Sequence, residues 1–158
     1  MNSFFEQIEG WFDFGDLYSE IVAWAPSPAT FVEVGIAHGK SLCYLGAKIK
    51  ESGKDIKLHG VDFFMPPFSK ADVFANLARA GCIEIVTLHS QLSHLAANEF
   101  ADASLDFVFL DACHDYIFVR ADIIAWLPKV RPGGILAGHD YNLKDWPGVV
   151  QAVDEAFP

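Results

Sequence analysis

Short apolar runs alternate with amphipathic stretches along most of the chain. The apolar runs predict strands over Thr30–Val34, Lys57–Val61, Ile83–Leu88, Leu105–Leu110 and Ile135–Ala137. Helical spacing between these runs predicts helices over Ser41–Lys50, Lys70–Ala80, Leu92–Asn98 and Tyr116–Val130. Continuous apolar strands separated by helices indicate a parallel sheet that is covered on both faces. Because crossovers between parallel strands are right-handed, the predicted fold class is a doubly wound α/β sheet.

A helical pattern also precedes the first strand. Apolar side chains recur at helical spacing over Phe4–Phe12, and Leu17–Trp24 predicts a second short helix that Pro26 and Pro28 close. The length of 158 residues suits one domain. We therefore predict a single domain over residues 1–158, with an N-terminal helical segment (1–28) and an α/β core (29–158).

Composition and charge narrow the class of partner. Eleven Lys and Arg against 21 Asp and Glu give a net charge of −10, which argues against nucleic acid. The three cysteines, Cys43, Cys82 and Cys113, are an odd number and lie far apart, which favours a reducing compartment. The chain starts without a signal-peptide pattern, and no apolar run approaches the ~18 residues of a membrane span. We expect a soluble, cytoplasmic protein without a membrane partner.

Polar residues follow every predicted strand. They are Glu33–Ser41, Asp62, Ser90 with Gln91, Asp111–Asp115, and His139 with Asp140. In a doubly wound sheet, ligands bind beyond the carboxyl ends of the strands, at the point where the strand order reverses. The sequence therefore predicts a single ligand-binding crevice there.

The stretch EVGIAHGKS, Glu33–Ser41, superficially resembles a phosphate-binding loop. That loop requires a glycine five residues before Gly39, where this chain has Val34. The G-x-G-x-x-G fingerprint of dinucleotide-binding proteins is also missing, because Ile36 and Ala37 follow Gly35. What remains is an acidic-x-Gly-x-x-x-Gly turn, which suits a ligand without phosphate.

Four motifs in this order resemble those of the class I, Rossmann-like methyltransferases that depend on S-adenosylmethionine. They are EVGIAHGKS, GVD at Gly60–Asp62, LDFVFLDACHDY at Leu105–Tyr116 and RPGGILAGHDY at Arg131–Tyr141. The chain is most similar to the branch that acts on small molecules, with relatives of catechol O-methyltransferase and of antibiotic-sugar methyltransferases. The resemblance covers about residues 31–157 and implies five strands in the order 3-2-1-4-5.

The resemblance also implies roles for residues around the cofactor. Gly35 and Gly39 would let the backbone pass close to the methionine end, Glu33 would attract its ammonium group, and Ser41 at the helix start would hold its carboxylate. Asp62 matches the residue that binds both ribose hydroxyls. The remaining implied cofactor contacts are Ser90 and Gln91 at the adenine and Asp111 on the cofactor side.

Two features bear on the chemistry of methyl transfer. In the metal-dependent branch, carboxylates after the fourth and fifth strands bind a divalent ion, and Asp111 and Asp140 occupy the matching positions. His139 stands where the catechol enzymes carry a further oxygen ligand, and imidazole is a poorer ligand for Mg²⁺. The cluster Asp111, His139 and Asp140 therefore predicts Mg²⁺ or another divalent metal, and the alternative is a site without metal.

His114 is the candidate general base, with Asp111 beside it as the second catalytic residue. It lies three residues after Asp111, where related enzymes carry a catalytic Lys or His. An ordinary imidazole pKa near 6.5 suits proton abstraction around neutrality.

The resemblance stops before the antiparallel hairpin that usually follows the fifth helix. The chain is therefore either a fragment or a minimal form in which the fifth strand, Ile135–Ala137, lies at the sheet edge. An exposed apolar edge favours association. We expect a homodimer, or an edge that the N-terminal segment covers.

Three functions follow from these observations. The leading one is methyl transfer from S-adenosylmethionine to a small hydroxylated acceptor. The second is an inactive or truncated domain that binds the cofactor without catalysis. The third is an oxidoreductase or hydroxylase on the same fold, against which the missing G-x-G-x-x-G motif argues.

Overall fold

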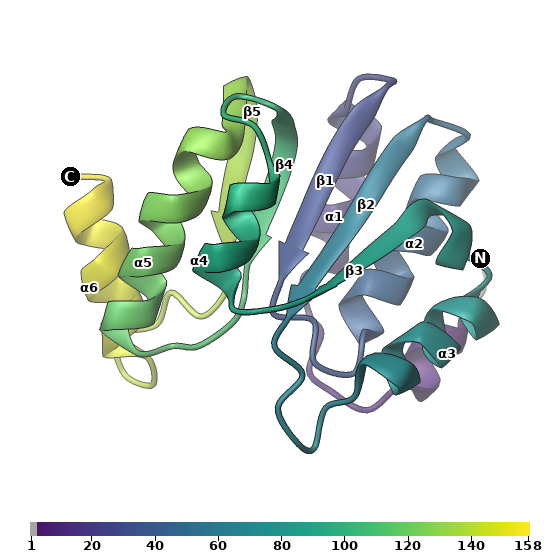
Figure 1. Ribbon diagram of the computed structural model, residues 1–158, viewed down its shortest axis with the longest axis horizontal. Coiled ribbons are helices and arrows are strands. Elements are labelled where there is room, and N and C mark those ends of the chain that lie inside the picture. Colours follow the sequence, from purple (N-terminus) through teal and green to yellow (C-terminus); the bar gives the residue numbers. More distant parts are fainter. Residues whose placement is uncertain (1–2) are drawn as a thin grey trace.

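The computed structural model describes residues 3–158 and is built around a parallel sheet (Figure 1). The five strands are β1 (Ala29–Val34), β2 (Ile56–Asp62), β3 (Val86–Ser90), β4 (Leu105–Leu110) and β5 (Val130–Gly138). Their order in the sheet is β3-β2-β1-β4-β5, and every pair is parallel. From β1, strands β2 and β3 follow on one side and β4 and β5 on the other, so the strand order reverses between β1 and β4. The predicted fold class and strand order are confirmed.

Helices cover both faces of the sheet (Figure 1). The α-helices are α1 (Gly15–Trp24), α2 (Lys40–Ser52), α3 (Lys70–Ala80), α4 (Ser93–Ala96), α5 (Tyr116–Trp126) and α6 (Pro147–Ala156). Short 3-10 helices are η1 (Ser3–Gln7), η2 (Ile83–Ile85), η3 (Ala97–Glu99) and η4 (Leu127–Lys129). Helix α6 packs on α5. Within residues 3–158, none of these helices has both the length and the apolar character needed to cross a membrane.

Alternation along the central strands builds one apolar core on each face. Phe31 and Phe107 point into a core formed with α1, α2 and α3, while their neighbours Val32 and Val108 point into a smaller core with α4 and α5. All four side chains are fully buried. Because successive side chains of a strand point to opposite faces, a strand that is apolar at every position requires cover on both.

The N-terminal segment differs from the sequence prediction. The apolar pattern over Phe4–Phe12 forms only the short helix η1, and the chain then turns at Gly10, where φ is +126°. The Phe12 ring packs on Phe14 and Tyr44, at centroid distances of 4.8 and 4.9 Å. The predicted helix is therefore wrong, because the spacing of these aromatic side chains serves a ring cluster instead.

The boundaries of one helix and two strands also differ from the prediction. The helix predicted to reach Val130 ends at Trp126, and β5 already begins at Val130, so that Pro132–Gly134 lie inside a strand. Proline is tolerated there because β5 is at the edge of the sheet, and the register with β4 shifts between Leu105 and Phe107. The predicted third strand starts three residues too early, since its first residues form η2.

The outer edge of β5 has no paired strand among the described residues. Helix η1 packs on α2 and α3, which lie away from β5, toward the opposite edge of the sheet (Figure 1). The N-terminal residues of η1 therefore do not cover this edge. In α1, Trp24 lies 5.8 Å from the Arg131 guanidinium of β5. The homodimer, and the alternative of an edge covered by the N-terminal segment (1–28), both stay predictions.

Candidate active site

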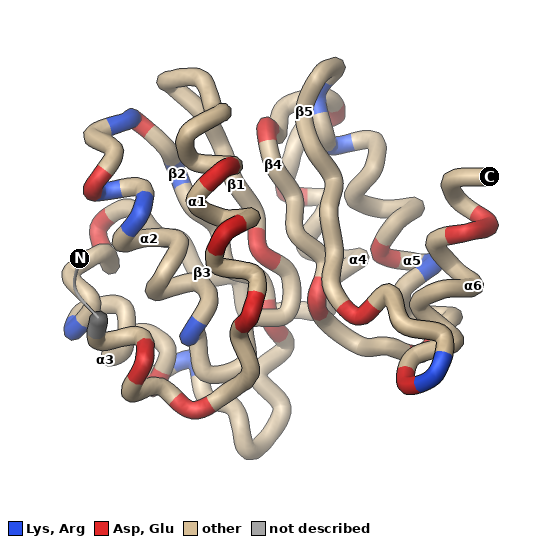
Figure 2. The backbone as a smooth tube through the Cα atoms, turned by 180° about the vertical axis from the view of Figure 1, so that it is seen from behind, with Lys and Arg blue, Asp and Glu red and all other residues tan. Residues whose placement is uncertain are grey.

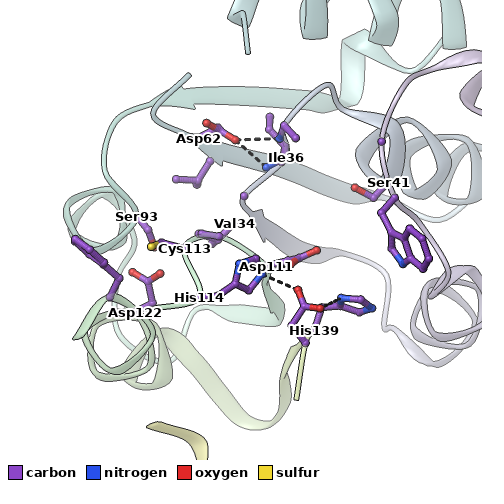
Figure 3. Close-up of a pocket in the computed structure, with 18 of the residues that line it drawn as sticks. Val34, Ile36, Ser41, Asp62, Ser93, Asp111, Cys113, His114, Asp122 and His139 are labelled. Atoms are coloured by element: carbon purple, nitrogen blue, oxygen red, sulfur yellow. Dashed lines mark hydrogen bonds and ion pairs between the residues drawn. The ribbon is translucent and has the colours of Figure 1, made fainter. Parts of the chain in front are cut away.

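A cleft of about 1570 Å³ opens at the carboxyl ends of the strands (Figure 3). It brings together most of the residues that the sequence predicted, namely Gly35, Ser41, Asp62, Gln91, Asp111, His114, His139 and Asp140. Glu33, Gly39 and Ser90 do not line it. The crevice thus lies at the switch point of the sheet, as expected for this fold class.

Asp62 at the end of β2 anchors the loop that follows β1. Its Oδ2 accepts hydrogen bonds from the backbone N–H groups of Ile36 and Ala37, each at 3.0 Å, and its Oδ1 accepts one from Phe64 at 2.7 Å. A carboxylate has about four lone-pair sites, so one remains on Oδ1 for a ligand hydroxyl. Asp62 therefore fixes the loop and keeps an acceptor facing the cleft.

The two glycines of the turn have left-handed backbone conformations and little room for a side chain. A Cβ atom on Gly35 would lie 2.0 Å from the backbone oxygen of Asp111, and φ there is +85°. A Cβ on Gly39 would meet Val73 at 3.0 Å, at a φ of +79°. The close approach at Gly35 is thus between the loops that follow β1 and β4, and it holds Asp111 beside the turn.

Glu33 is buried behind the cleft. Its side chain is 1% exposed and accepts a hydrogen bond from Ser41, which does line the cleft. Burial raises the pKa of Glu33 to about 8, against the opposing effects of Ser41 and Tyr18. Neither Glu33 Oε2 nor the Tyr18 hydroxyl makes a hydrogen bond of normal geometry. Glu33 therefore orients Ser41, and burial favours its protonated form.

The start of α2 offers donors for an anion. The first backbone N–H groups of a helix have no hydrogen-bond partner within that helix. This applies to α2, a full helix of 13 residues. Ser41 lies in this first turn. A carboxylate is favoured at such a helix start, which fits the expected amino-acid end of the cofactor.

The third strand contributes one residue to the cleft instead of two. Ser90 is exposed at the end of β3, paired in register with Asp62. Gln91 lines the cleft, and its amide nitrogen donates to Glu99. The backbone N–H of Gln91 donates to the backbone carbonyl oxygen of Asp62 at 3.1 Å, which ties the two strand ends together.

Asp111, His139 and Asp140 form a compact group of metal-ligand side chains. One donor atom from each lies within 4.8 Å of the others. Burial raises the pKa of Asp111, as does the neighbouring Asp140 carboxylate. Burial alone would lower the pKa of His139, but the nearby carboxylates, Asp111 first among them, raise it. The two carboxylates suit Mg²⁺ or Mn²⁺, whereas the imidazole suits Zn²⁺, Fe²⁺ or Ni²⁺, so the donor set is a mixed one.

His114 lies at the same place. Its Nε2 is 2.6 Å from Asp140 Oδ2 and 3.7 Å from Asp111 Oδ1, although the close contact is not aligned as a hydrogen bond. The imidazole stacks on Trp146 at a centroid distance of 4.1 Å. His114 is therefore held between a carboxylate pair and an aromatic wall, facing the cleft (Figure 3).

Sequence reasoning missed Asp122, Trp146 and Asp13. Asp122 is a buried carboxylate of α5 in the cleft wall, and Asp13 Oδ1 lies 3.0 Å from His139 Nε2. Asp122 precedes the buried Trp126 by four residues, so it lies on the inner helix face, and an acidic residue there was a detectable signal. Nothing in the local pattern marked Asp13 or Trp146.

Comparison with known proteins identifies the family. A family described as "Methyltransferase domain" matches residues 32–141, which include the end of β1, the cleft turn and β2 to β5. The chain belongs to this methyltransferase family. No curated protein sequence matches it.

Solved structures, two methyltransferases among them, share the fold. A Corynebacterium glutamicum protein is 17% identical, with a TM-score of 0.71 over 95% of this chain and 73% of its own. A TDP-rhamnose 3′-O-methyltransferase of calicheamicin biosynthesis is 19% identical, with a TM-score of 0.62 over 89% of this chain and 66% of its own. A Geobacter sulfurreducens S-adenosylmethionine-dependent methyltransferase, solved with S-adenosylhomocysteine, is 16% identical, with a TM-score of 0.53 over 77% and 45%. The expected class I, S-adenosylmethionine-dependent methyltransferase is confirmed at the level of family and fold.

Proposed function

We propose that this methyltransferase moves the methyl group of S-adenosylmethionine to a hydroxyl group of a small molecule. The observation that supports it most is the placement of His114 and the Asp111, His139 and Asp140 group in the same cleft as the β1 turn and Asp62. A donor site and a proton-accepting site thus share one cavity. In-line displacement needs mainly alignment and removal of one proton.

The donor site divides along the cleft. The first turn of α2 with Ser41 would hold the methionine carboxylate, and the free lone pair of Asp62 Oδ1 would accept from a ribose hydroxyl. Gly35 and the Asp111 backbone form the floor between them. The methyl donor would then be held in the same cleft as Asp111, His139 and Asp140.

The acceptor site centres on His114. Its imidazole would take the hydroxyl proton as the acceptor oxygen bonds to the methyl carbon and the carbon–sulfur bond breaks, which leaves S-adenosylhomocysteine. Asp140, 2.6 Å from His114 Nε2, would stabilise the imidazolium that forms. A divalent ion bound by Asp111, His139 and Asp140 would lower the pKa of an acceptor hydroxyl.

Calorimetric titration with S-adenosylhomocysteine tests the donor site. We expect micromolar binding to the wild-type protein and at least about 10-fold weaker binding to Asp62→Ala, because a hydrogen bond to a charged group contributes about 1.5–3 kcal/mol. Asp102→Asn, an exposed carboxylate outside the cleft, is the matched control. An intact, folded wild-type protein that does not bind the ligand would exclude the proposal.

Single-turnover methyl transfer with a screen of hydroxylated acceptors tests the catalytic half. His114→Gln should bind S-adenosylhomocysteine normally and lose about 100-fold or more in rate, the usual contribution of general base catalysis. The rates of wild type and Asp111→Asn are compared with and without added Mn²⁺ or Mg²⁺. A metal-stimulated rate that Asp111→Asn loses would favour a metal-dependent reaction, and a wild-type rate that does not change with metal would favour a metal-free one. Cofactor binding without transfer to any acceptor would instead favour a non-catalytic binding domain.

A further inference from the structure

His139 has a carboxylate at each of its two ring nitrogens. Its Nε2 is 3.0 Å from Asp13 Oδ1, and its Nδ1 is 3.2 Å from Asp140 Oδ1. A neutral imidazole carries one proton and therefore donates from only one of these nitrogens. The other nitrogen then faces a carboxylate oxygen with two lone pairs opposed. Either a second proton or a metal ion is needed to satisfy such a pair.

The Nδ1 side of the ring is the side of the metal-ligand group. One donor atom each of Asp111, His139 and Asp140 lies within 4.8 Å of the others (Figure 3). His114 Nε2 lies beside the same group, 2.6 Å from Asp140 Oδ2, and is buried without a hydrogen bond. Several lone pairs therefore converge near Nδ1, whereas Nε2 faces Asp13. This distribution suits a proton on Nε2 and a metal ion at Nδ1.

Aromatic packing of the N-terminal segment places Asp13 at this position. Asp13 stands between Phe12 and Phe14, whose ring centroids are 4.8 Å apart. The Phe14 ring packs on the His139 ring at 5.0 Å and on Phe109 of β4 at 4.7 Å. The Asp13 side chain is itself 58% exposed, so its contact with the imidazole depends on this packing.

We propose that Asp13 is a positioning residue for the divalent ion and acts through His139. By accepting the Nε2 proton, Asp13 fixes the tautomer in which the Nδ1 lone pair is free for the ion, and it makes that nitrogen a stronger donor. This inference rests on the metal ion of the proposed function. The N-terminal segment then contributes to metal affinity, although the ligands themselves follow β4 and β5.

Titration of the protein with Co²⁺ alone, followed by visible absorption, tests the proposal without cofactor or acceptor. We expect the wild-type protein to bind Co²⁺, and Asp13→Ala to bind it about 10- to 100-fold more weakly, the usual effect of removing such a partner. Asp13→Asn should recover most of this loss, because its amide oxygen still accepts from Nε2–H. Glu9→Ala removes another exposed carboxylate of the same segment and cleft. This matched control should bind Co²⁺ like the wild type.

Proton NMR of the Co²⁺ form gives a second readout, because a metal-bound imidazole has a strongly shifted, exchangeable N–H signal. We expect such a signal in wild type and Glu9→Ala, its absence in His139→Ala, and its loss by fast exchange in Asp13→Ala.

Three outcomes would overturn the inference. They are wild-type Co²⁺ affinity in Asp13→Ala, an equal loss of affinity in Glu9→Ala, and a wild-type protein that does not bind Co²⁺. The last would leave His139 as an imidazolium between two carboxylates. Binding of S-adenosylhomocysteine is measured separately, and its absence would refute the donor site of the proposed function whatever the Co²⁺ titrations show.

Discussion

Glu33 contributes to the site without lining the cleft, because it accepts a hydrogen bond from Ser41. The acidic position of the turn was expected to meet the cofactor ammonium, yet its carboxyl group is buried beneath Ser41. A sequence motif gives the order of residues, but it does not show which of their side chains are buried. Asp122 is the reverse case, because its spacing of four residues from Trp126 indicates the inner face of α5, and only the structure shows that this face borders the cleft.

The buried state of Glu33 predicts a pH-dependent stability. Its pKa is raised to about 8, so the folded protein keeps a proton that the unfolded chain releases above pH 4.5. This contribution is complete below pH 4.5 and is lost as pH rises through 8. Near pH 6.5 it lowers the free energy of unfolding by about 1.4 kcal/mol per pH unit, and this slope falls to about half at pH 8. Glu33→Gln should remove that slope in urea denaturation.

Asp122→Asn is the matched control for this experiment. The pKa of Asp122 is raised only to about 6, so its contribution is already lost below the pH window used. That variant should retain the wild-type slope between pH 6.5 and 8. Equal slopes for wild type and Glu33→Gln would mean that Glu33 is ionised in the folded protein, and a direct role at the cofactor ammonium would then regain support.

At the scale of elements, the strands were predictable where both faces are covered. β1 and β4 are central, and their continuous apolar runs define them almost to the residue. β5 was predicted too short, because Pro132–Gly134 normally interrupts a strand and only an edge position allows it. The N-terminal aromatic cluster was mistaken for a helix, because its side chains recur at helical spacing although the Phe12 ring packs on the distant Tyr44.

The crossing of the loops after β1 and β4 gives a prediction at this scale. Gly35→Ala places a methyl group 2.0 Å from the Asp111 oxygen in a left-handed backbone, so β1 and β4 must separate. We expect a loss of about 3 kcal/mol or more in urea denaturation. Gly53→Ala has a similar φ of +68° but open space around it, and should cost only about 1–2 kcal/mol. Equal losses would show that the crossing is not tightly packed.

At the scale of the whole molecule, negative charge is concentrated around the cleft. Acidic positions lie along α1 and near the ends of the strands (Figure 2). The cleft lining includes the carboxylates of Glu9, Asp13, Asp62, Asp111, Asp122, Asp140 and Asp145, against Lys40 and Lys144. The Lys40 ammonium donates to the Gly10 oxygen at 3.0 Å. The net charge of −10 therefore adds to a negative potential at the entrance.

This charge distribution predicts which acceptors are used. We expect kcat/KM to rank an amino-glycoside above the matching neutral glycoside, and both above the matching sugar phosphate, because like charge is repelled from the cleft. Raising the salt concentration from 50 to 500 mM should lower kcat/KM for the cationic acceptor about 3- to 10-fold and leave the neutral one unchanged. Asp145→Lys, at the exposed rim of the cleft, should reduce the differences in kcat/KM between these acceptors. A sugar phosphate that outperforms the neutral glycoside in wild type would refute the electrostatic argument.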